Sequence, residues 1–267
     1  MTDGPPGPIG PSYREYAPTA DLRPYVACTW VKVIGPRPAP SPIIPDGCVD
    51  VVVVGDAPPH VAGPASVTQW IAPLPPGSAV TGIRFRPGAA RALLRHPADG
   101  LRDRDAPLVD VCGARASGVL LDALASSREP AARRLALERW ARDRIAQGCS
   151  ADLPLVGAAA ALIRDPNQTV AALADGLGWS ERRLHRAFAA TCGYGPKTLQ
   201  RIMRLQRALG VARAGDRPAR LAELAIAAGY ADQAHMTRDF GALTGFTPAV
   251  YLAAADLDVG RWLDEPG

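Results

Sequence analysis

Two short segments in the last third of the chain carry polar side chains at helical spacing. They are Arg182, Arg183, His185 and Arg186 in the first segment, and Gln233, His235, Thr237 and Arg238 in the second. Guanidinium and amide groups can form paired hydrogen bonds with base edges in the major groove of DNA. A short helix that turns these groups outward would suit that groove, although a single exposed arginine is more often a solvated surface charge.

A second set of charged and thiol side chains lies in the amino-terminal half. Its members are Asp46, Cys48, Asp50, Arg84 and Arg86. Together they could line a pocket that binds a small molecule. Alternate residues of a strand face opposite sides, however, so they cannot all point inward unless the strands are irregular. The sequence Pro-Asp-Gly-Cys at 45–48 also fits a tight turn in which glycine takes a positive φ, and this interpretation is favoured.

The cysteines indicate neither a metal centre nor a disulfide framework. They are odd in number and widely spaced, at Cys28, Cys48, Cys112, Cys149 and Cys192. Because no C-x-x-C pair occurs, we expect buried, unreactive thiols and no cofactor. No local motif brings a nucleophile, a base and an orienting group together, so we expect no enzymatic activity.

The elements that must position the DNA-facing groups follow from a duplication between Val170 and Pro248. Residues separated by 51 positions are Leu173/Leu224, Gly178/Gly229 and Trp179/Tyr230, and residues separated by 52 positions are Phe188/Phe240, Gly193/Gly245 and Pro196/Pro248. Each copy has the pattern of a helix, a tight turn and a second helix.

The turn of each copy contains a glycine, Gly178 or Gly229, which can adopt the left-handed conformation that a helix end requires. Ser180 and Asp232 then offer an oxygen that caps the next helix. We expect these second helices at 181–190 and 233–243. Four aromatic residues are assigned to the core of the two copies: Trp179, Phe188, Tyr230 and Phe240.

This region resembles the AraC/XylS family of transcriptional regulators over roughly the last hundred residues. The resemblance rests on the turn glycines with their following aromatic residues, on the Phe188/Phe240 anchors and on the closing GYGP and GFTP. It implies two helix-turn-helix units joined by a long helix at 196–214 and preceded by a helix at 153–164. It also implies double-stranded DNA as the partner, with both recognition helices in successive major-groove segments on one face of the duplex.

Two amino-terminal stretches, IPDGCVDVVVV and GIRFRPGAARALL, resemble the amino-terminal region of one subgroup of the same regulators. This weaker match implies a module that senses a small-molecule effector or forms a homodimer, and it identifies no ligand. Contact with the transcription machinery would follow from such a role.

Composition is consistent with a two-domain α+β protein. The 267 residues are 48% hydrophobic and 21% charged, with a net charge of +4. We see no run that could span a membrane and no targeting leader, so we expect a cytoplasmic protein without membrane contact. Residues 1–12 are predicted to be a disordered leader and residues 255–267 an acidic tail. Between them we expect a β-rich regulatory domain at 13–148 and the DNA-binding domain at 149–254.

Short extended runs broken by proline and glycine predict a small antiparallel β barrel or sandwich in the first domain. The runs lie at 25–33, 49–54, 60–62, 67–72 and 79–86. Prolines between 36 and 45 indicate a loop or an edge strand. A helix is expected to start at Arg86-Pro87-Gly88, with Pro87 in its first turn, and further helices are expected at 114–125 and 130–147.

The helix at 130–147 carries an apolar stripe made of Leu137, Trp140, Ala141 and Ile145. Such a stripe shows that a face is buried but not against what. These helices could form the interface with the DNA-binding domain or a dimer contact, or they could simply cover the β domain.

Three classes of function compete for this pattern. The leading one is a sequence-specific transcription regulator whose amino-terminal domain responds to an effector. The alternative is a set of DNA-binding helices fused to an alkyl-transfer or other enzymatic domain, which in the adaptive-response type would need clustered cysteines that are not present. A protein that coats DNA regardless of sequence would be expected to carry a larger positive charge.

Overall fold

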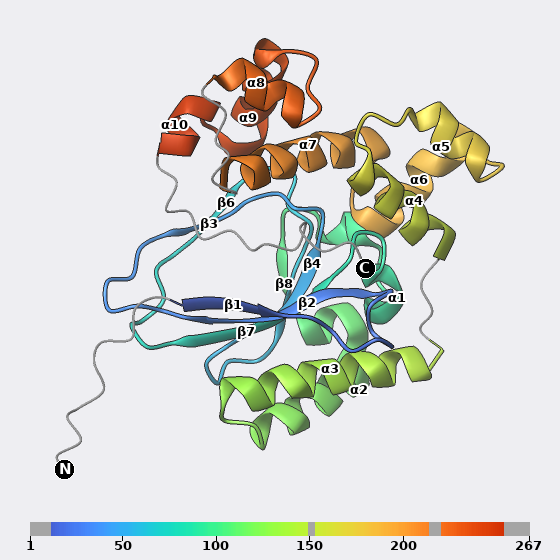
Figure 1. The fold of residues 1–267 in the computed structure, drawn as a ribbon. Helices are drawn as coiled ribbons and strands as arrows, with labels where there is room; N and C mark the ends of the chain where they lie inside the picture. Colours follow the sequence, from blue (N-terminus) through green and yellow to red (C-terminus); the bar gives the residue numbers. More distant parts are fainter. Residues whose placement is uncertain (1–11, 149–152, 214–219, 254–267) are drawn as a thin grey trace.

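The computed structural model describes residues 12–148, 153–213 and 220–253. Within them, a part made of strands and helices is followed by an all-helical carboxy-terminal part (Figure 1). The expected α+β class, with an antiparallel sheet and a helical carboxy-terminal domain, is confirmed. No helix in these residues is long and apolar enough to cross a membrane.

The strands form a six-stranded antiparallel sheet and a separate two-stranded one. The large sheet has the order β1 (Ser12–Tyr16), β2 (Val26–Val33), β7 (Ala79–Phe85), β4 (Val49–Val54), β5 (His60–Ala62) and β8 (Asp105–Pro107). The small sheet pairs β3 (Ser41–Ile43) with β6 (Gln69–Ile71). The prolines between residues 36 and 45 indicated a loop or an edge strand. β3 is an edge strand, because it pairs only with β6 in the described sheets.

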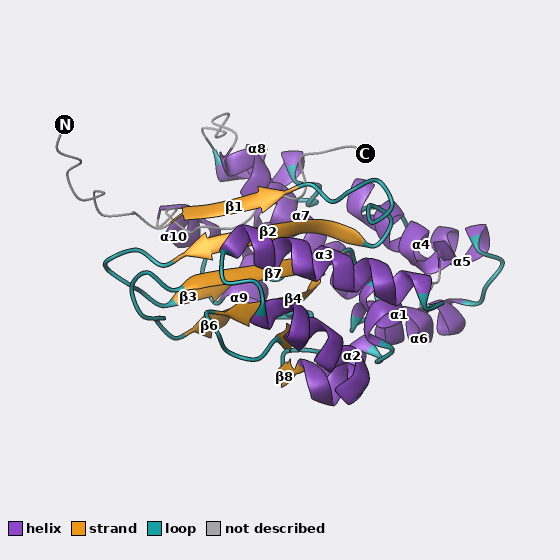
Figure 2. Cartoon of the chain, turned by 90° about the horizontal axis from the view of Figure 1, so that it is seen from below, coloured by secondary structure: helices purple, strands orange, loops and turns teal. Residues whose placement is uncertain are grey.

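The central strands are buried on both faces, which explains their nearly continuous apolar sequence. Val51, Ile83 and Phe85 belong to the larger cluster, which packs against α1 (Ala90–Leu94), α2 (Leu108–Ala125) and α3 (Pro130–Ala146). Trp30 and Val52 belong to a smaller cluster on the other face. Figure 2 shows α3 lying across the strands.

Two glycines alter the helices that were expected in this part. Gly88 has a φ of 86°, so α1 begins only at Ala90 and the expectation that Pro87 occupies its first turn is wrong. α2 begins at Leu108 and is broken at Gly113, where φ is 81° and ψ is 163°. The expected start at residue 114 therefore marks only the segment after the break.

The apolar stripe of α3 packs on the sheet. Leu137, Trp140 and Ala141 are almost fully buried in the same cluster as Ile83 and Phe85, and Ile145 packs partly buried against it. The hypothesis that this stripe forms the interface with the DNA-binding domain or a dimer contact is therefore wrong. The helices cover the β domain, because its apolar strand faces need a partner layer.

The carboxy-terminal helices repeat one arrangement twice. They are α4 (Leu153–Arg164), α5 (Val170–Gly176), α6 (Glu181–Cys192), α7 (Pro196–Arg213), α8 (Leu221–Ala227), α9 (Gln233–Thr244) and α10 (Pro248–Ala253). α7 lies between the pair α5 and α6 and the pair α8 and α9 (Figure 1). Phe188, Phe240 and Leu199 are fully buried in one core, to which both helix pairs and α7 contribute.

Several expected boundaries lie outside the described residues. This is so for residues 1–11 of the predicted leader, for the predicted acidic tail at 255–267 and for Ala214 at the end of the linker helix. Ser12, which was placed in the leader, begins β1 and pairs with Val33.

Candidate nucleic-acid interface

The first recognition helix, α6, is fixed at both ends by local chemistry. The Ser180 side chain accepts a hydrogen bond from the Arg183 backbone N–H at 3.3 Å, which satisfies one of the free donors of a helix start. Gly193 ends the helix with a φ of 85°. Leu184 and Phe188 are fully buried, so the opposite face of α6 must point to solvent.

The four polar residues expected on that face are all exposed, but their surroundings differ. The Arg183 guanidinium stacks on the Trp179 ring at 4.1 Å from its centroid, and Trp179 is only half-buried rather than a full core residue. A β-carbon at Gly195 would lie 2.9 Å from Nδ1 of His185, so this ring lies over the Gly195 backbone.

The side chains of Arg182 and Arg186 are less restrained than those of Arg183 and His185. Arg182 and Arg186 are four residues apart and so lie on one side of the helix. Within the described residues, neither takes part in a hydrogen bond, an ion pair or a ring contact. Their guanidinium groups are therefore available to a partner outside the chain.

The second recognition helix, α9, is built in the same way. Asp232 accepts a hydrogen bond from the His235 backbone N–H at 2.6 Å, and Gly245 ends the helix with a φ of 78°. Gln233 and Arg238 are exposed. Met236 and Phe240 are fully buried and Tyr230 is 3% exposed, as expected of core residues.

Two of the residues expected to face DNA from α9 are half-buried. The His235 ring meets the Tyr230 ring edge-on at 5.2 Å, and its Nε2 lies 3.7 Å from Oδ2 of Asp239. The Thr237 hydroxyl donates to the Gln233 carbonyl at 2.9 Å. His235 is thus held by Tyr230 and Asp239, whereas the side chains of Gln233 and Arg238 have no partner among the described residues.

The buried carboxylate of Asp239 joins α9 to the central helix. Its Oδ1 accepts from Nε of Arg201 at 2.8 Å, and its Oδ2 lies 3.9 Å from Nη2 of Arg204. Asp239 is 5% exposed, so the two arginines compensate a charge that would otherwise be costly to bury. Sequence reasoning missed this residue because its counterpart in the first copy, 52 positions earlier, is Ala187.

The amino-terminal set is only partly brought together. Arg84 lies opposite Asp50 in the strand register. Its Nη2 lies 3.0 Å from Oδ2 of Asp50, and its Nη1 lies 3.4 Å from Asp46 and 3.7 Å from Glu15. The Cys48 side chain is buried beside them. Arg86 is apart, because its Nε donates to the Arg23 carbonyl at 2.7 Å.

This arrangement is an ion network with more carboxylates than cations. Burial by itself would lower the pKa of Arg84, but Asp50 and Asp46 outweigh it and hold that pKa well above its usual value. Burial raises the pKa of Asp46 against the opposing effect of Arg84, and Asp50 raises it further. Glu15 and the Trp30 indole, which donates to Asp50 at 3.0 Å, were not found from the sequence because β1 and β2 are distant from Asp50 in the chain.

Residues 45–48 form the tight turn that was favoured, and the turn rests on the central helix. The Asp46 carboxylate accepts from the Cys48 backbone N–H at 2.9 Å, and Gly47 has a φ of 83°. A β-carbon at Gly47 would lie 3.0 Å from Cδ1 of Leu199 in α7. Gln206, also in α7, donates to the Pro45 carbonyl at 2.6 Å.

Two further joints connect the amino-terminal part to the recognition helices. The Thr68 N–H donates to the Leu243 carbonyl of α9 at 2.7 Å. At the end of α6, a β-carbon on Gly193 would lie 2.4 Å from Cγ of Pro64. α6 also contacts α1 and the short helix η1 (Ala98–Leu101). Both recognition helices thus contact the amino-terminal part directly.

The described residues contain no cluster of His, Cys, Asp or Glu side chains suited to a metal ion. Cys28, Cys48 and Cys192 are buried, and burial raises the pKa of each thiol, that of Cys192 to about 12. These three thiols are therefore protonated at neutral pH and poor nucleophiles, as was expected of buried cysteines. Cys112 is only half-buried, and Cys149 lies outside the described residues.

Two family models match the chain. One, a helix-turn-helix domain, matches residues 173–254, which contain both recognition helices and the helix between them. The carboxy-terminal domain is an AraC-type helix-turn-helix domain. The other, a domain of unknown function (DUF6597), matches residues 14–107, which hold the strands and the turn that contacts the AraC-type domain.

Solved structures of ToxT from Vibrio cholerae are similar to most of the chain at low identity. ToxT of strain O395 has 10% identity and a TM-score of 0.44, with 91% of this chain and 97% of ToxT covered. Wild-type ToxT of strain SCE256, bound to an unsaturated fatty acid, has 12% identity and a TM-score of 0.42, with 80% and 90% covered. No curated protein sequence matched this chain.

Proposed function

We propose that the protein is a transcription regulator that reads a specific DNA sequence with both recognition helices. α6 and α9 would enter two major-groove segments on one face of the duplex, about one helical turn or ~34 Å apart. The observation that carries this proposal is that two capped helices, held by one central helix, each present polar side chains with no partner in the described chain.

We assign different roles to the exposed polar residues. Arg182 and Arg186 of α6, with Gln233 and Arg238 of α9, are proposed to bond base edges, because arginine and glutamine suit paired contacts there. Arg183, His185, Thr237 and His235 already contact the protein, so we propose that they position the backbone of the DNA.

The amino-terminal domain is proposed to control DNA binding through the turn at 45–48. An effector can change an equilibrium only by preferring one of two arrangements. The turn connects the Arg84 network to Leu199 and Gln206 of α7, so a displacement of Asp46 would reach the helix that spaces the two recognition helices. Because Asp46 and Asp50 both pair with Arg84, we propose that these three residues transmit the signal. Homodimer formation and contact with the transcription machinery stay predictions.

Selection from a pool of random DNA duplexes tests the DNA-binding function. The proposal predicts that the purified full chain enriches a bipartite motif whose halves are about one helical turn apart. The enriched duplex should also bind more tightly than unselected DNA at the same salt concentration. Failure to enrich any motif would indicate a protein that coats DNA regardless of sequence and would overturn the proposal.

A further inference from the structure

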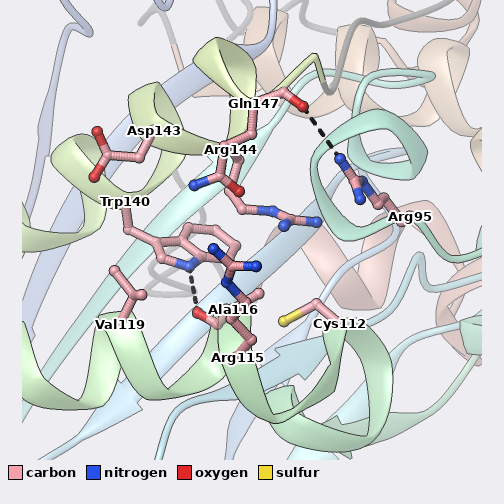
Figure 3. Close-up of a pocket in the computed structure, with 9 residues that line it drawn as sticks. All are labelled: Arg95, Cys112, Arg115, Ala116, Val119, Trp140, Asp143, Arg144 and Gln147. Carbon is pink, nitrogen blue, oxygen red and sulfur yellow. Dashed lines mark hydrogen bonds between the residues drawn. The ribbon is translucent and has the colours of Figure 1, made fainter.

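A cavity of about 430 Å³ lies between α2 and α3, on the side of the sheet away from the Arg84 network. Figure 3 shows its walls, and the dashed lines mark hydrogen bonds from Arg95 to the Gln147 carbonyl and from Trp140 to the Ala116 carbonyl. The cavity contains none of the residues discussed above as DNA-facing or network residues.

The polar part of this cavity is strongly positive. Arg95, Arg115 and Arg144 line it, and Asp143 is the one acidic residue among its walls. In Figure 3 the Arg144 guanidinium lies between those of Arg95 and Arg115. Guanidinium groups that converge in this way match the oxygens of a carboxylate or a phosphate.

Arg144 points to a ligand because its hydrogen bonding is incomplete. The residue is 6% exposed, and its Nε donates to the Leu93 carbonyl at 2.8 Å. Its Nη2 is buried and has no hydrogen-bond partner among the described residues. Buried polar groups of a charged side chain nearly always have partners, so an acceptor in the cavity would complete this one.

The opposite wall is apolar. Trp140 is 2% exposed, and its indole N–H is already satisfied by the Ala116 carbonyl at 2.9 Å. Val119 and Ala116 extend this wall. A ligand that fits the whole cavity would therefore carry an apolar or aromatic body in addition to its acidic group.

The break of α2 adds to the preference for an anion. After Gly113 the helix restarts, so Arg115 and Ala116 lie in the first turn of the segment that ends at Ala125. The start of a helix carries a partial positive charge and free N–H groups. This feature supports the arginines but would not define a site alone.

We propose that this cavity binds the effector and that the effector is a small organic anion, with a carboxylate or phosphate group on an apolar body. The identification as effector rests on the function proposed above. The Leu93 carbonyl that Arg144 holds belongs to α1, and α1 packs against the recognition helix α6. A ligand that draws Arg144 into the cavity would thus act on the joint between the regulatory domain and α6.

Calorimetric titration of the full chain tests the site with three probes: 4-phenylbutyrate, phenyl phosphate and the neutral amide of 4-phenylbutyrate. We expect both anions to bind and the amide not to bind. Arg115→Ala, at an exposed position, should weaken the anions about tenfold, the effect of losing one charge-assisted hydrogen bond. Arg144→Lys keeps the charge but loses the planar guanidinium with its paired donors, so it should also weaken binding of the anions.

Arg139→Ala is the matched control, because Arg139 is an exposed arginine of α3 that does not line the cavity. It should leave probe binding unchanged. Failure of both anions to bind, or equal weakening by Arg115→Ala and Arg139→Ala, would overturn the proposed site. Equal binding of the amide would overturn the assignment of an anion.

Binding of the selected DNA duplex without probes separates this inference from the function on which it rests. If the chain binds that duplex specifically but does not bind the anions, only the cavity proposal is wrong. If the anions bind and no sequence-specific DNA binding exists, the site stands as an anion site and its role as effector site is wrong.

Discussion

The arginines of α6 differ in what restrains them, and we propose that this difference separates contact with bases from other roles. Arg183 is held on the Trp179 ring, so its guanidinium can approach DNA in few orientations. Arg186 has no such restraint within the described residues. A free guanidinium in the middle of a helix that fits the major groove can form the two hydrogen bonds that discriminate guanine from other bases.

Replacement of Arg186 by alanine should therefore weaken binding selectively. We expect a loss of about 1–3 kcal/mol on the selected duplex and a much smaller loss on random DNA. Fluorescence anisotropy at one fixed salt concentration measures both values, with Arg139→Ala as a charge-matched control. Equal losses on the two DNAs would assign Arg186 to the phosphate backbone instead.

The buried network makes a prediction about pH. The pKa of Asp46 is raised in the folded chain by burial, so the folded state binds this proton more tightly than the unfolded state. Its contribution to stability is therefore lost as pH rises above the carboxyl's usual pKa of about 4. Asp46→Asn should flatten the decrease in melting temperature that occurs as pH rises above about 4.

Asp21→Asn is a control for the direction of the pH dependence. Hydrogen bonds from Thr19 and Arg142 lower the pKa of Asp21, so this residue contributes stability that is present above its unfolded pKa and lost on acidification. Its removal should change the pH dependence in the opposite direction, by little because the group is exposed. An unchanged pH profile in Asp46→Asn would contradict the charge assignment of the network.

At the scale of elements, the recognition helices could be predicted from residues at their own ends. Features that depend on contacts between distant parts of the chain could not. Gly178, Gly229, Ser180 and Asp232 act on their immediate neighbours, so both turns and both caps were predictable. The break at Gly113 and the role of Asp239 were not. The role of Asp239 depends on Arg201 and Arg204 of α7, and a single sequence does not record those partners.

The contacts of Asp239 predict that the second helix-turn-helix unit can be destabilised without a direct effect on the first. Asp239→Ala should lower the free energy of unfolding by about 1–3 kcal/mol, because Arg201 and Arg204 lose a buried partner. Urea denaturation followed by circular dichroism provides the value. Glu223→Ala, an exposed charge on α8, should have almost no effect; a similar loss in both variants would show that Asp239 has no special structural role.

At the scale of the whole molecule, the amino-terminal domain contacts α6, α7 and α9. We propose that changes in this domain alter the spacing of the recognition helices. Gly47 tests the contact with α7. Its φ of 83° would cost alanine about 1–2 kcal/mol, and the new β-carbon would lie 3.0 Å from Leu199. Gly77→Ala carries the same backbone penalty, since φ is 79°, but meets open space.

Comparison of these two glycine variants isolates the contact between the domains. Both should be destabilised, and only Gly47→Ala should also change the affinity for the selected duplex. DNA titrations of the two folded variants at one temperature decide this. Equal affinities would mean that the turn does not communicate with the DNA-binding domain.

The most direct test of the account is a hydroxyl-radical footprint of the full chain on the DNA upstream of its own gene. Two recognition helices on one central helix should protect two segments per chain, on one face of the duplex and about one helical turn apart. Asp239→Ala should weaken protection of one segment more than of the other, because only α9 depends on that residue. Protection of a single segment per chain, in the wild type, would contradict reading by both units.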